Sequence, residues 1–389
     1  MGEETVSLLD AVGRVLSEDV ITAVDMPQWD NSARDGFAVR ADDCRQTATL
    51  KIMGYIPAGG VADGLLVSPG TAIKIMTGAP VPAGCTAIVP IEETIEEGDV
   101  VQINGPVNIR DHIRFQGEDI KAGEKILSAG TVIRPPEVNL CASLGKIYLA
   151  VFRKPKVAIL STGDELVEPG ETTGQGQIVN SNAFSLAASV KELGAEPLLL
   201  GIARDTKQSL QHKIQQGLNA DVLITSAGVS AGDRDFVRIV LEELGVHQLF
   251  WKINIKPGRP TAFGLKDNKP VFSLPGNPVS TMVTFEEFVR PALLKMMGHK
   301  YVIKPTIKAR LKEATKKKGG RAQFLRVKVT KDCSGLTATS AGDQNTGIVR
   351  TMIDANAIAF LPEDRTSIDA GEYVEVHLID SFENMSLFE

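Results

Sequence analysis

The sequence predicts a multidomain protein of the α/β plus β class, built around a doubly wound parallel sheet. Its 389 residues exceed one ordinary domain, which holds roughly 100 to 200 residues. From residue 154 to residue 302, apolar runs of strand length alternate with helical patterns, as in a series of βα repeats. Before and after that stretch, short Val, Ile and Thr runs are broken by Gly and Pro, so β-rich modules should flank the α/β domain.

The N-terminal part should combine two helices with a compact all-β module. Residues 7–16 carry apolar side chains at helical spacing behind Ser7, a suitable N-cap, which predicts a short helix. The strand texture of residues 47–118 predicts the module. The run EKILSAGTVI resembles a hairpin, and residues 135–144 start with two prolines and stop at Gly145, which predicts the second helix.

The α/β stretch contains five strand candidates and four helix candidates. The strands are KVAIL, PLLLGIA, DVLIT, LFWKI and PVFSL, and the helices are residues 183–193, 206–218, 235–244 and 279–297. After Pro305 the runs QFLRVKV, AIAFL and YVEVHLI predict a small C-terminal β domain. The run KKKGGR, residues 316–321, lies between strand candidates and is interpreted as a solvated hairpin tip without a functional role.

Composition excludes some classes of function. A net charge of -6 and an aromatic content of 5% argue against a nucleic-acid binder, which needs excess Lys and Arg or stacking side chains. No segment approaches the roughly 20 apolar residues that span a bilayer, and the N-terminus has no apolar leader, so we expect a cytoplasmic protein without membrane partners. The four cysteines lack zinc-site spacing and are interpreted as reduced, packed thiols.

Carboxylates follow three of the predicted strands. STGDEL after KVAIL supplies Asp164 and Glu165, RDT after PLLLGIA supplies Asp205, and SAGVSAGDRD after DVLIT supplies Asp233 and Asp235. Ligands bind beyond the carboxyl ends of parallel strands, and hard oxygen donors gathered there suit Mg²⁺ with its bridged phosphates. Each Asp taken alone could simply cap the following helix, but three on one edge favour a metal site.

Three loops at the same edge are candidates for anion and ring binding. The Gly-rich loop SAGVSAGD could bring backbone N–H groups to an anion, or be only a tight turn. KINIKPGRP spaces Lys252, Lys256 and Arg259 around a Pro-Gly turn, which suits a tetrahedral dianion, although an exposed turn carrying lysines is the alternative. The stiff loop LPGNPVS suits the wall of a planar ligand, or merely starts a helix.

Together these motifs resemble the MoeA and gephyrin E-domain family of molybdopterin molybdenumtransferases. STGDEL, the pair Ser181–Asn182, GVSAGD with Asp235, KPGRP and LPGNPVS are similar to its molybdopterin-binding domain. MPQWDNSARDGFAVR, TGAPVP and GEDI are similar to its N-terminal motifs, and AGDQNTG fits the C-terminal domain. So many ordered matches along the chain make coincidence implausible.

The resemblance implies four domains and a set of site residues. The domains would be residues 1–46 with 120–153 as an N-terminal composite domain, 47–119 as an inserted β module, 154–302 as the α/β molybdopterin-binding domain, and 303–389 as a β-barrel domain. The implied catalytic positions are Asp35, Thr77, Asp119, Glu165, Asp205 and Asp235, the last three also as metal ligands. The implied substrate-binding positions are Ser161, Thr162, Gly163, Asp164, Ser181, Asn182, Gly228, Ser230, Gly232, Asp233, Lys252, Pro275, Gly276, Asn277 and Pro278. The implied molybdate-binding positions are Lys256, Arg259, Pro260, Ser280, Arg321 and Thr346.

The resemblance also implies a reaction and an assembly. A Mg²⁺-dependent homodimer would insert molybdate into adenylylated molybdopterin and release AMP, with Asp35, Thr77 and Asp119 acting from one subunit and the α/β edge from its partner. The adenylyltransferase and the acceptor proteins of the same pathway are further expected partners. Two alternatives stay open: an adenylyltransferase, since that pathway enzyme has the same type of α/β domain, and a gephyrin-like scaffold that binds receptor tails.

Overall fold

The computed structural model describes residues 1–228, 236–333 and 335–379. The chain forms two compact units. The larger unit comprises Met1–Thr5, Gly13–Ser17 and Ala150–Glu389, and the smaller comprises Val6–Val12 and Glu18–Leu149. β1 (Glu3–Ser7) and β12 (Tyr148–Phe152) pair with each other where the chain passes between the units.

The smaller unit contains a six-stranded sheet with an apolar cluster on each face. Its strands, in spatial order, are β7 (Ala87–Pro90), β4 (Gly36–Val39), β6 (Thr71–Ile75), β5 (Ala48–Ile56), β9 (Val100–Ile103) and β8 (Thr94–Glu97). Phe37 and Val39 of β4 pack in one cluster and Ala38 in the other, the alternation that a strand imposes. The sheet therefore begins before residue 47, the start that the sequence suggested for this module.

The remainder of the smaller unit contains short strand pairs and one helix. Pro135–Ser143 forms α1, followed by Gly145 at φ 73°, so the second predicted helix is confirmed. The expected hairpin in EKILSAGTVI is wrong, because β11 (Lys125–Leu127) pairs instead with β2 (Val20–Ile21). Likewise β10 (Ile113–Arg114) pairs with β3 (Asn31–Ser32). Two short 3₁₀ turns, Ala41–Cys44 and Ile91–Glu93, join the strands of the sheet.

The predicted helix over residues 7–16 is also wrong. The segment is strand β1 followed by turns, and Leu16 then forms an antiparallel bridge with Val151. A helix there would bury one apolar face, yet Leu9 is 80% exposed and Val12 is 49% exposed. Pairing with β12 satisfies the backbone of this segment and overrides its helical spacing.

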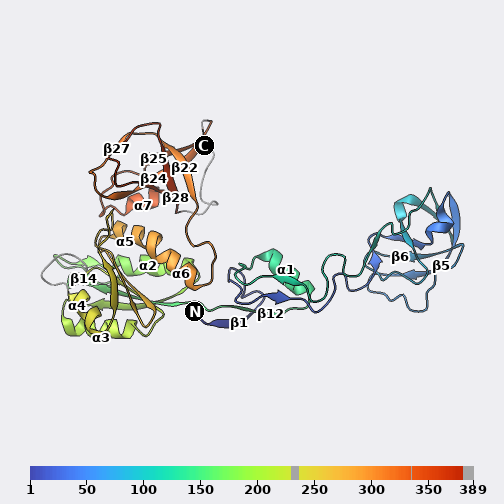
Figure 1. The fold of residues 1–389 in the computed structure, drawn as a ribbon, viewed down its shortest axis with the longest axis horizontal. Coiled ribbons are helices and arrows are strands. Elements are labelled where there is room, and N and C mark those ends of the chain that lie inside the picture. The colour runs from blue at the N-terminus through green and yellow to red at the C-terminus, as the bar shows by residue number, and fades with distance from the viewer. Residues whose placement is uncertain (229–235, 334, 380–389) are drawn as a thin grey trace. The chain divides into compact units, whose positions relative to one another are not determined.

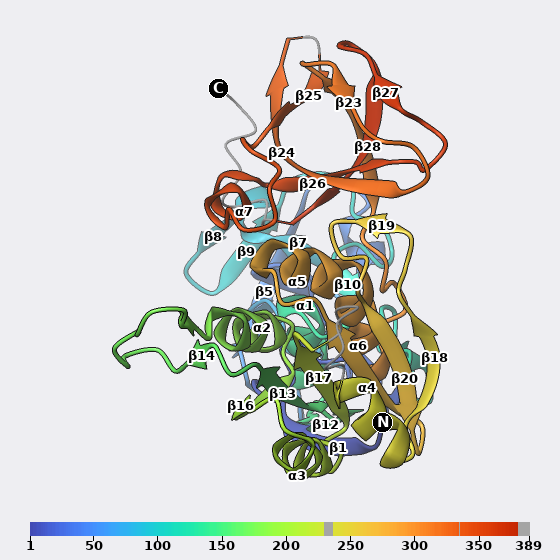
Figure 2. The ribbon, with the colours of Figure 1, turned by 90° about the vertical axis from the view of Figure 1, so that its left-hand side faces the viewer.

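The larger unit has a doubly wound α/β domain, as predicted (Figure 1). Its six strands, in spatial order, are β16 (Glu196–Ala203), β13 (Lys156–Thr162), β17 (Val222–Ser226), β21 (Lys269–Leu274), β20 (Ala262–Lys266) and β18 (His247–Trp251). The first four are parallel, whereas β20 is antiparallel to both its neighbours, so the sheet is mixed at one side. The short strands β14 (Leu166–Val167) and β15 (Ile178–Val179) pair in an arm that extends away from the sheet (Figure 2).

Helices cover both faces of this sheet. One face packs against α2 (Ser181–Glu192), α5 (Pro278–Thr284), the π-helical turn Phe285–Val289 and α6 (Arg290–Met296). The other face packs against α3 (Lys207–Gly217) and α4 (Phe236–Glu243). Val157 and Ile159 of β13 point into the first layer while Ala158 and Leu160 point into the second, which explains why this strand is an unbroken apolar run.

A closed β-barrel forms the C-terminal part, as expected from the resemblance (Figure 2). The strands β24 (Ala322–Asp332), β25 (Gly335–Ser340), β22 (Thr306–Leu311), β28 (Tyr373–Leu378) and β26 (Ala357–Leu361) pair in that order, and β26 pairs again with β24. β19 (Ile255–Lys256), which belongs to the α/β domain, adds to β24 in parallel. The barrel also carries the pair β23 (Thr315–Lys316) and β27 (Ser367–Ile368) and the helix α7 (Arg350–Asp354).

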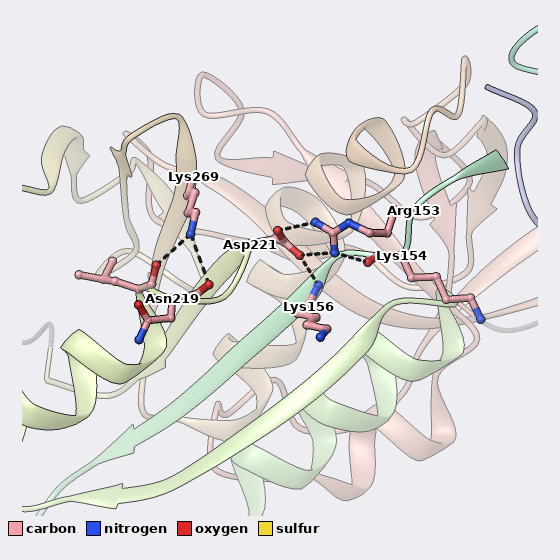
Figure 3. A network of polar contacts seen from close by, with 7 residues as sticks. Arg153, Lys154, Lys156, Asn219, Asp221 and Lys269 are labelled. Atoms are coloured by element: carbon pink, nitrogen blue, oxygen red, sulfur yellow. Dashed lines mark hydrogen bonds and ion pairs between the residues drawn. The ribbon is translucent and has the colours of Figure 1, made fainter. Parts of the chain in front are cut away.

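An ionic network ties the start of the α/β domain to its central strand (Figure 3). Arg153 donates from both terminal nitrogens to the carboxylate of Asp221, at 3.0 and 2.8 Å, and the backbone N–H of Lys156 donates to the same carboxylate at 2.8 Å. Nearby, Lys269 donates to the carbonyls of Leu218 and Asn219. These contacts fix the amino ends of β13, β17 and β21 at the edge away from the strand ends where a ligand would bind.

Two further features concern the whole described chain. All four cysteines are free, and three are packed while Cys333 is exposed, so the expectation of packed thiols is wrong for Cys333. Within the described ranges, no helix combines the length and the apolar character needed to cross a bilayer.

Candidate functional site

A pocket of about 240 Å³ lies at the carboxyl ends of β13, β17 and β21. Some of the residues that line it belong to the predicted motifs, and others are neighbours of those motifs. The lining residues are Ser161, Glu165, Leu166, Ile178, Val179, Asn180, Ser181, Asn182, Ser226, Ala227, Gly276, Asn277 and Pro278. Leu166, Ile178, Val179 and Pro278 are apolar, whereas the serines and asparagines are polar. The pocket can therefore hold a flat ring between apolar side chains and hydrogen-bond its edge.

Polar side chains at the start of α2 organise this pocket. Ser161 donates to Oδ1 of Asn180 at 2.7 Å, and Nδ2 of Asn182 donates to Ser226 at 3.0 Å and to the carbonyl of Gly276 at 2.8 Å. Two buried atoms, Nδ2 of Asn180 and Oδ1 of Asn182, have no hydrogen-bond partner among the described residues. Leaving a buried donor or acceptor unpaired costs free energy, and both of these asparagines line the pocket.

The turn after β13 positions the two predicted carboxylates of STGDEL differently. Gly163 has φ 145°, and a Cβ at that position would collide with the carboxylate of Glu165, which folds back over it. Asp164 accepts a hydrogen bond from the backbone N–H of Asp205 at 3.1 Å, so the first two strand ends are joined. Thr162 is buried beneath this turn and donates to the carbonyl of Ser226.

The glycine loop after β17 is described only at its start. Ala227 and Gly228 both have φ 72°, and a Cβ on Gly228 would collide with Val237 of α4. The predicted site residues Ser230, Gly232, Asp233 and Asp235 lie outside the described residues. No group of three His, Cys, Asp or Glu side chains placed to hold a metal is found in the described part of the chain.

A second, strongly basic cavity of about 810 Å³ lies where β19 joins β24. It is lined by Lys256, Lys316, Lys317, Lys318, Gly319, Arg321 and Gln323. Lys317 donates to the carbonyls of Arg321 and Glu363, which holds the lysine loop in place. The interpretation of 316–321 as a plain hairpin tip is wrong in two respects: β23 pairs with β27 instead of β24, and the three lysines line a cavity together with the predicted Lys256 and Arg321.

The other predicted anion-binding residues lie outside the lining of that cavity. Lys252 and Arg259 are exposed on the turn that precedes β20, where their backbones bond to Thr261 and Ile253. Ser280 is buried in α5, and its carbonyl accepts from Thr284. Pro260, half-buried, follows Arg259 on the same turn.

Thr346 of the barrel contacts the pocket loop of the α/β domain. Nδ2 of Asn277 donates to the Thr346 hydroxyl at 3.1 Å, and the N–H of Val279 donates to the Thr346 carbonyl at 3.3 Å. Pro275, beneath this loop, is buried, and its carbonyl accepts from Thr281. The structure thus brings Thr346 to the rim of the first pocket.

Three predicted catalytic residues belong to the smaller unit. Asp35 accepts hydrogen bonds from the Thr77 N–H at 2.7 Å and from the Thr77 hydroxyl at 2.8 Å. The Thr77 backbone bond, followed by its hydroxyl bond, lowers the pKa of Asp35 below the ordinary value of 3.8. Asp119 is exposed on another turn, where its N–H donates to the carbonyl of Met26. Asp35 and Thr77 are therefore joined by two hydrogen bonds, and the catalytic roles of these residues and of Asp119 stay predictions.

Comparison with known proteins covers the whole chain. Residues 1–145 match a model of the MoeA N-terminal region (domain I and II), residues 158–295 a probable molybdopterin binding domain, and residues 308–379 the MoeA C-terminal region (domain IV). The molybdopterin molybdenumtransferase of Haemophilus influenzae is 36% identical over 96% of this chain and 93% of its own length. Molybdopterin molybdenumtransferase 2 of Mycobacterium tuberculosis is 38% identical over 96% of this chain and 94% of its own.

This chain belongs to the MoeA family. Its fold agrees with that of a molybdopterin biosynthesis MoeA protein from Pyrococcus horikoshii, at a TM-score of 0.85, 34% identity and coverage of 98% of this chain and 95% of that one. A molybdenum cofactor biosynthesis protein from Pyrococcus furiosus, with a TM-score of 0.58 at 24% identity and coverage of 97% of this chain and 92% of that one, shares the fold.

Sequence reasoning missed several residues of the MoeA-type pocket. Asn180 directly precedes the Ser181–Asn182 pair, and its place beside that polar motif was a usable signal, whereas its burial, with 2% of it exposed, is a property of the structure. Ile178 and Val179 belong to the arm and are exposed, so nothing in their local pattern indicates a ligand. The lysine loop carried the clearest signal, a run of cations, but its cavity depends on the pairing of β19 with β24.

Proposed function

We propose that this chain is a molybdopterin molybdenumtransferase, which transfers molybdenum from molybdate to adenylylated molybdopterin and releases AMP in molybdenum cofactor biosynthesis. One observation carries the proposal: a ring-sized pocket and a basic cavity lie within one unit and are linked by the packing of β19 against α5. Ile255, next to Lys256 of the cavity, packs with Val279 at the start of α5, and α5 begins at the rim of the pocket. The relatives that carry this enzyme's name match the chain from end to end.

The pocket would take the pterin ring. Its volume of about 240 Å³ is below the roughly 300–1,000 Å³ of pockets that enclose a whole drug-sized ligand, so only part of the substrate fits. The amide edge of a pterin offers both a donor and an acceptor, which polar side chains of the pocket lining, such as Ser181 and Asn277, would bind. The phosphates and the adenosine would then extend over the strand ends.

The basic cavity would take molybdate before transfer. Molybdate is a tetrahedral dianion, and Lys256, Lys318 and Arg321 supply cations that can bond to its oxygens. Two molybdate oxygens exchange for the two dithiolene sulfurs, and each leaves with a thiol proton as hydroxide. Addition of one water across the pyrophosphate linkage releases AMP.

Magnesium fits this site by the chemistry of its donors. Mg²⁺ is usually held by one or two carboxylates together with substrate phosphates, so Glu165 and Asp205 are the described residues that would hold it without a three-residue cluster. When bound, the ion would neutralise charge on the pyrophosphate. Asp164 positions the Asp205 turn through its hydrogen bond to the backbone.

We further propose that the enzyme acts as a homodimer. Leu9, Val12, Ile147 and Tyr148 are large apolar side chains that are 49% to 80% exposed, and they lie on adjoining segments of the smaller unit, where the Leu8 N–H donates to Ile147. Apolar side chains gathered on a surface mark sites of protein association. A second copy of the chain is the partner that the family implies, and the adenylyltransferase and acceptor proteins are further proposed partners.

The direct test is AMP release from adenylylated molybdopterin with and without molybdate, using sulfate as a control anion. We expect release that depends on molybdate and not on sulfate. Lys256→Ala should raise the half-saturating molybdate concentration by about tenfold, because it removes one charge-assisted hydrogen bond. Lys308→Ala is the matched control, since Lys308 lines a different hollow of the barrel. Equal and negligible release with either anion would rule out the proposed activity, and consumption of ATP would favour an adenylyltransferase instead.

A further inference from the structure

Arg326 is a cation buried in the barrel. It lies in the middle of β24 and is 1% exposed, and no carboxylate within the described residues forms an ion pair with it. Burial lowers the pKa of Arg326, with nearby Asp343 acting in the opposite direction. A buried charge is retained at a considerable cost, so its hydrogen bonds indicate what it is for.

Those hydrogen bonds converge on one loop, residues 341–347, which we call the 341–347 loop. Nη2 of Arg326 donates to the carbonyl of Asp343 at 3.0 Å and to the carbonyl of Asn345 at 3.2 Å. Its backbone N–H donates to Oε1 of Gln344 at 3.0 Å, and its carbonyl accepts from Nε2 of the same side chain at 3.1 Å. Nε of Arg326 donates to Thr351, just beyond the loop, at 2.8 Å.

The loop itself is short and has turns of its own. Asp343 accepts from the N–H of Asn345 at 2.9 Å, and Asn345 accepts from the N–H of Gly347 at 3.0 Å. These two side chains bond to the backbone of the loop itself. The conformation that places residue 346 also depends on the donors that hold the loop carbonyls from the side of the barrel. Arg326 supplies that support, because a guanidinium offers donors in a fixed planar geometry.

Residue 346 is where the barrel reaches the candidate site. The Thr346 hydroxyl accepts from Asn277, which lines the pterin-sized pocket, and the Thr346 carbonyl accepts from the N–H of Val279. Val279 is in the first turn of α5, where N–H groups lack acceptors within the helix. The 341–347 loop, which belongs to the barrel, therefore supplies an acceptor for a backbone N–H in the first turn of α5.

We propose that Arg326 is a positioning residue of the pocket, which holds the 341–347 loop so that Thr346 fixes Asn277 and the start of α5. It does not touch the substrate and acts through the loop. The inference rests on the proposed function for its effect on turnover, but the positioning itself can be measured in the protein alone.

The first experiment measures hydrogen exchange in the full chain without substrate. Arg326→Lys keeps the charge but cannot reach the carbonyls and Thr351 at once, so exchange of the Val279 amide should speed up about tenfold or more while β22 and β28 stay protected. Arg310→Lys is the matched control, because Arg310 is a barrel arginine that bonds to Tyr373, and it should change nothing at Val279.

The second experiment measures AMP release as a function of substrate concentration. Loss of one hydrogen bond at the pocket wall should raise KM for adenylylated molybdopterin about fivefold in Thr346→Val and about tenfold in Arg326→Lys, with kcat changed less. Because both lesions act through one contact, the double variant should show about the tenfold effect of Arg326→Lys alone. Independent sites would instead multiply to about fifty-fold.

Several results would overturn the inference. These are unchanged exchange at Val279 in folded Arg326→Lys, faster exchange throughout the barrel, or multiplicative effects on KM. If Arg326→Lys does not fold, Thr351→Val replaces it, since it removes the acceptor of Nε together with the bond that the hydroxyl donates to the Ile348 carbonyl, and unchanged exchange at Val279 then overturns the inference. Absence of AMP release by the wild-type enzyme would contradict the proposed function and leave the exchange result to decide on positioning.

Discussion

Replacing Asp221 with asparagine should destabilise the α/β domain by about 2 kcal/mol, because the change removes a charge that accepts three hydrogen bonds. Asparagine keeps the shape but has one acceptor oxygen and cannot pair with both nitrogens of Arg153. Hydrogen bonds to charged groups contribute roughly 1.5–3 kcal/mol, and the lower part of that range applies because Arg153 is 37% exposed. The site at the opposite edge of the sheet should be unaffected.

The destabilisation should depend on pH. Burial acts to raise the pKa of Asp221, but the hydrogen bonds from Arg153 and the Lys156 N–H outweigh it and leave that pKa below 3.8. A carboxyl group whose pKa is lower in the folded than in the unfolded state stabilises the fold at pH values above its unfolded pKa. That stabilisation is lost as the pH falls through its folded pKa. The difference between wild type and variant should therefore be full at pH 7 and shrink below about pH 4.

Fluorescence can report on this domain alone. The chain has two tryptophans, Trp29 in the smaller unit and Trp251 in β18, so a Trp29→Phe background leaves the sheet as the reporter. With a slope near 2 kcal/mol per molar urea, the midpoint should fall by about 1 M. Glu243→Gln, which breaks the exposed pair with Lys207, is the matched control and should cost less than about 0.5 kcal/mol. An unchanged midpoint in Asp221→Asn at pH 7 would refute the reasoning.

Three other predictions concern the candidate site. Glu165→Gln should lower AMP release by about 100-fold or more with the fold intact, since it removes the carboxylate that we propose as a magnesium ligand, and near-normal turnover at saturating magnesium would contradict this. Mixing inactive Asp35→Ala with inactive Glu165→Gln should restore about a quarter of wild-type activity if the subunits complement each other; a dead mixture with proven subunit exchange would exclude complementation. Thr77→Val should raise the pKa of Asp35 towards its ordinary value, as measured by NMR titration of that carboxyl, because one of two hydrogen bonds is lost; an unchanged titration would show that the hydroxyl contributes nothing.

Much of the α/β domain could be predicted because its strands and helices have distinct hydrophobic periods. β13 is apolar from Val157 to Leu160, as a strand covered on both faces must be, and α2 follows it in the chain at helical spacing. β20 was missed although a signal existed. Asp267 and Asn268 both have positive φ, which is the two-residue hairpin turn that joins β20 to β21, and such a pair between apolar runs predicts a hairpin.

Errors in the smaller unit have a common cause. Leu9 and Val12 match a helical pattern, but the backbone partner that determines their conformation, β12, lies more than a hundred residues later in the chain. Similarly β4 belongs to a sheet whose other strands begin at residue 48. A local pattern gives the hydrophobic period of a segment but does not identify the strand with which that segment pairs. Pairing with a distant strand therefore overrides the local pattern.

The site could be predicted where its residues follow strands and not where it depends on contacts between domains. Residues of the 161–165 and 275–278 segments lie together because carboxyl ends of parallel strands meet at one edge. The cavity of Lys256 and Lys318 is different, since 62 positions separate them and only the pairing of β19 with β24 unites them. Asp35 and Thr77 were proposed from resemblance, and their direct hydrogen bond had no signal in their spacing.

The addition of β19 to β24 makes the boundary between the α/β domain and the barrel a poor place to truncate the protein. A chain ending at residue 304 would lose Phe324 and Ile358, the barrel side chains that cover Ile255 and Val283. It would also leave the backbone of β19 unpaired beside that apolar surface. Unpaired strands next to exposed apolar side chains promote aggregation, so such a fragment would be expected to precipitate on expression while a fragment spanning residues 150–389 keeps the shared strand intact.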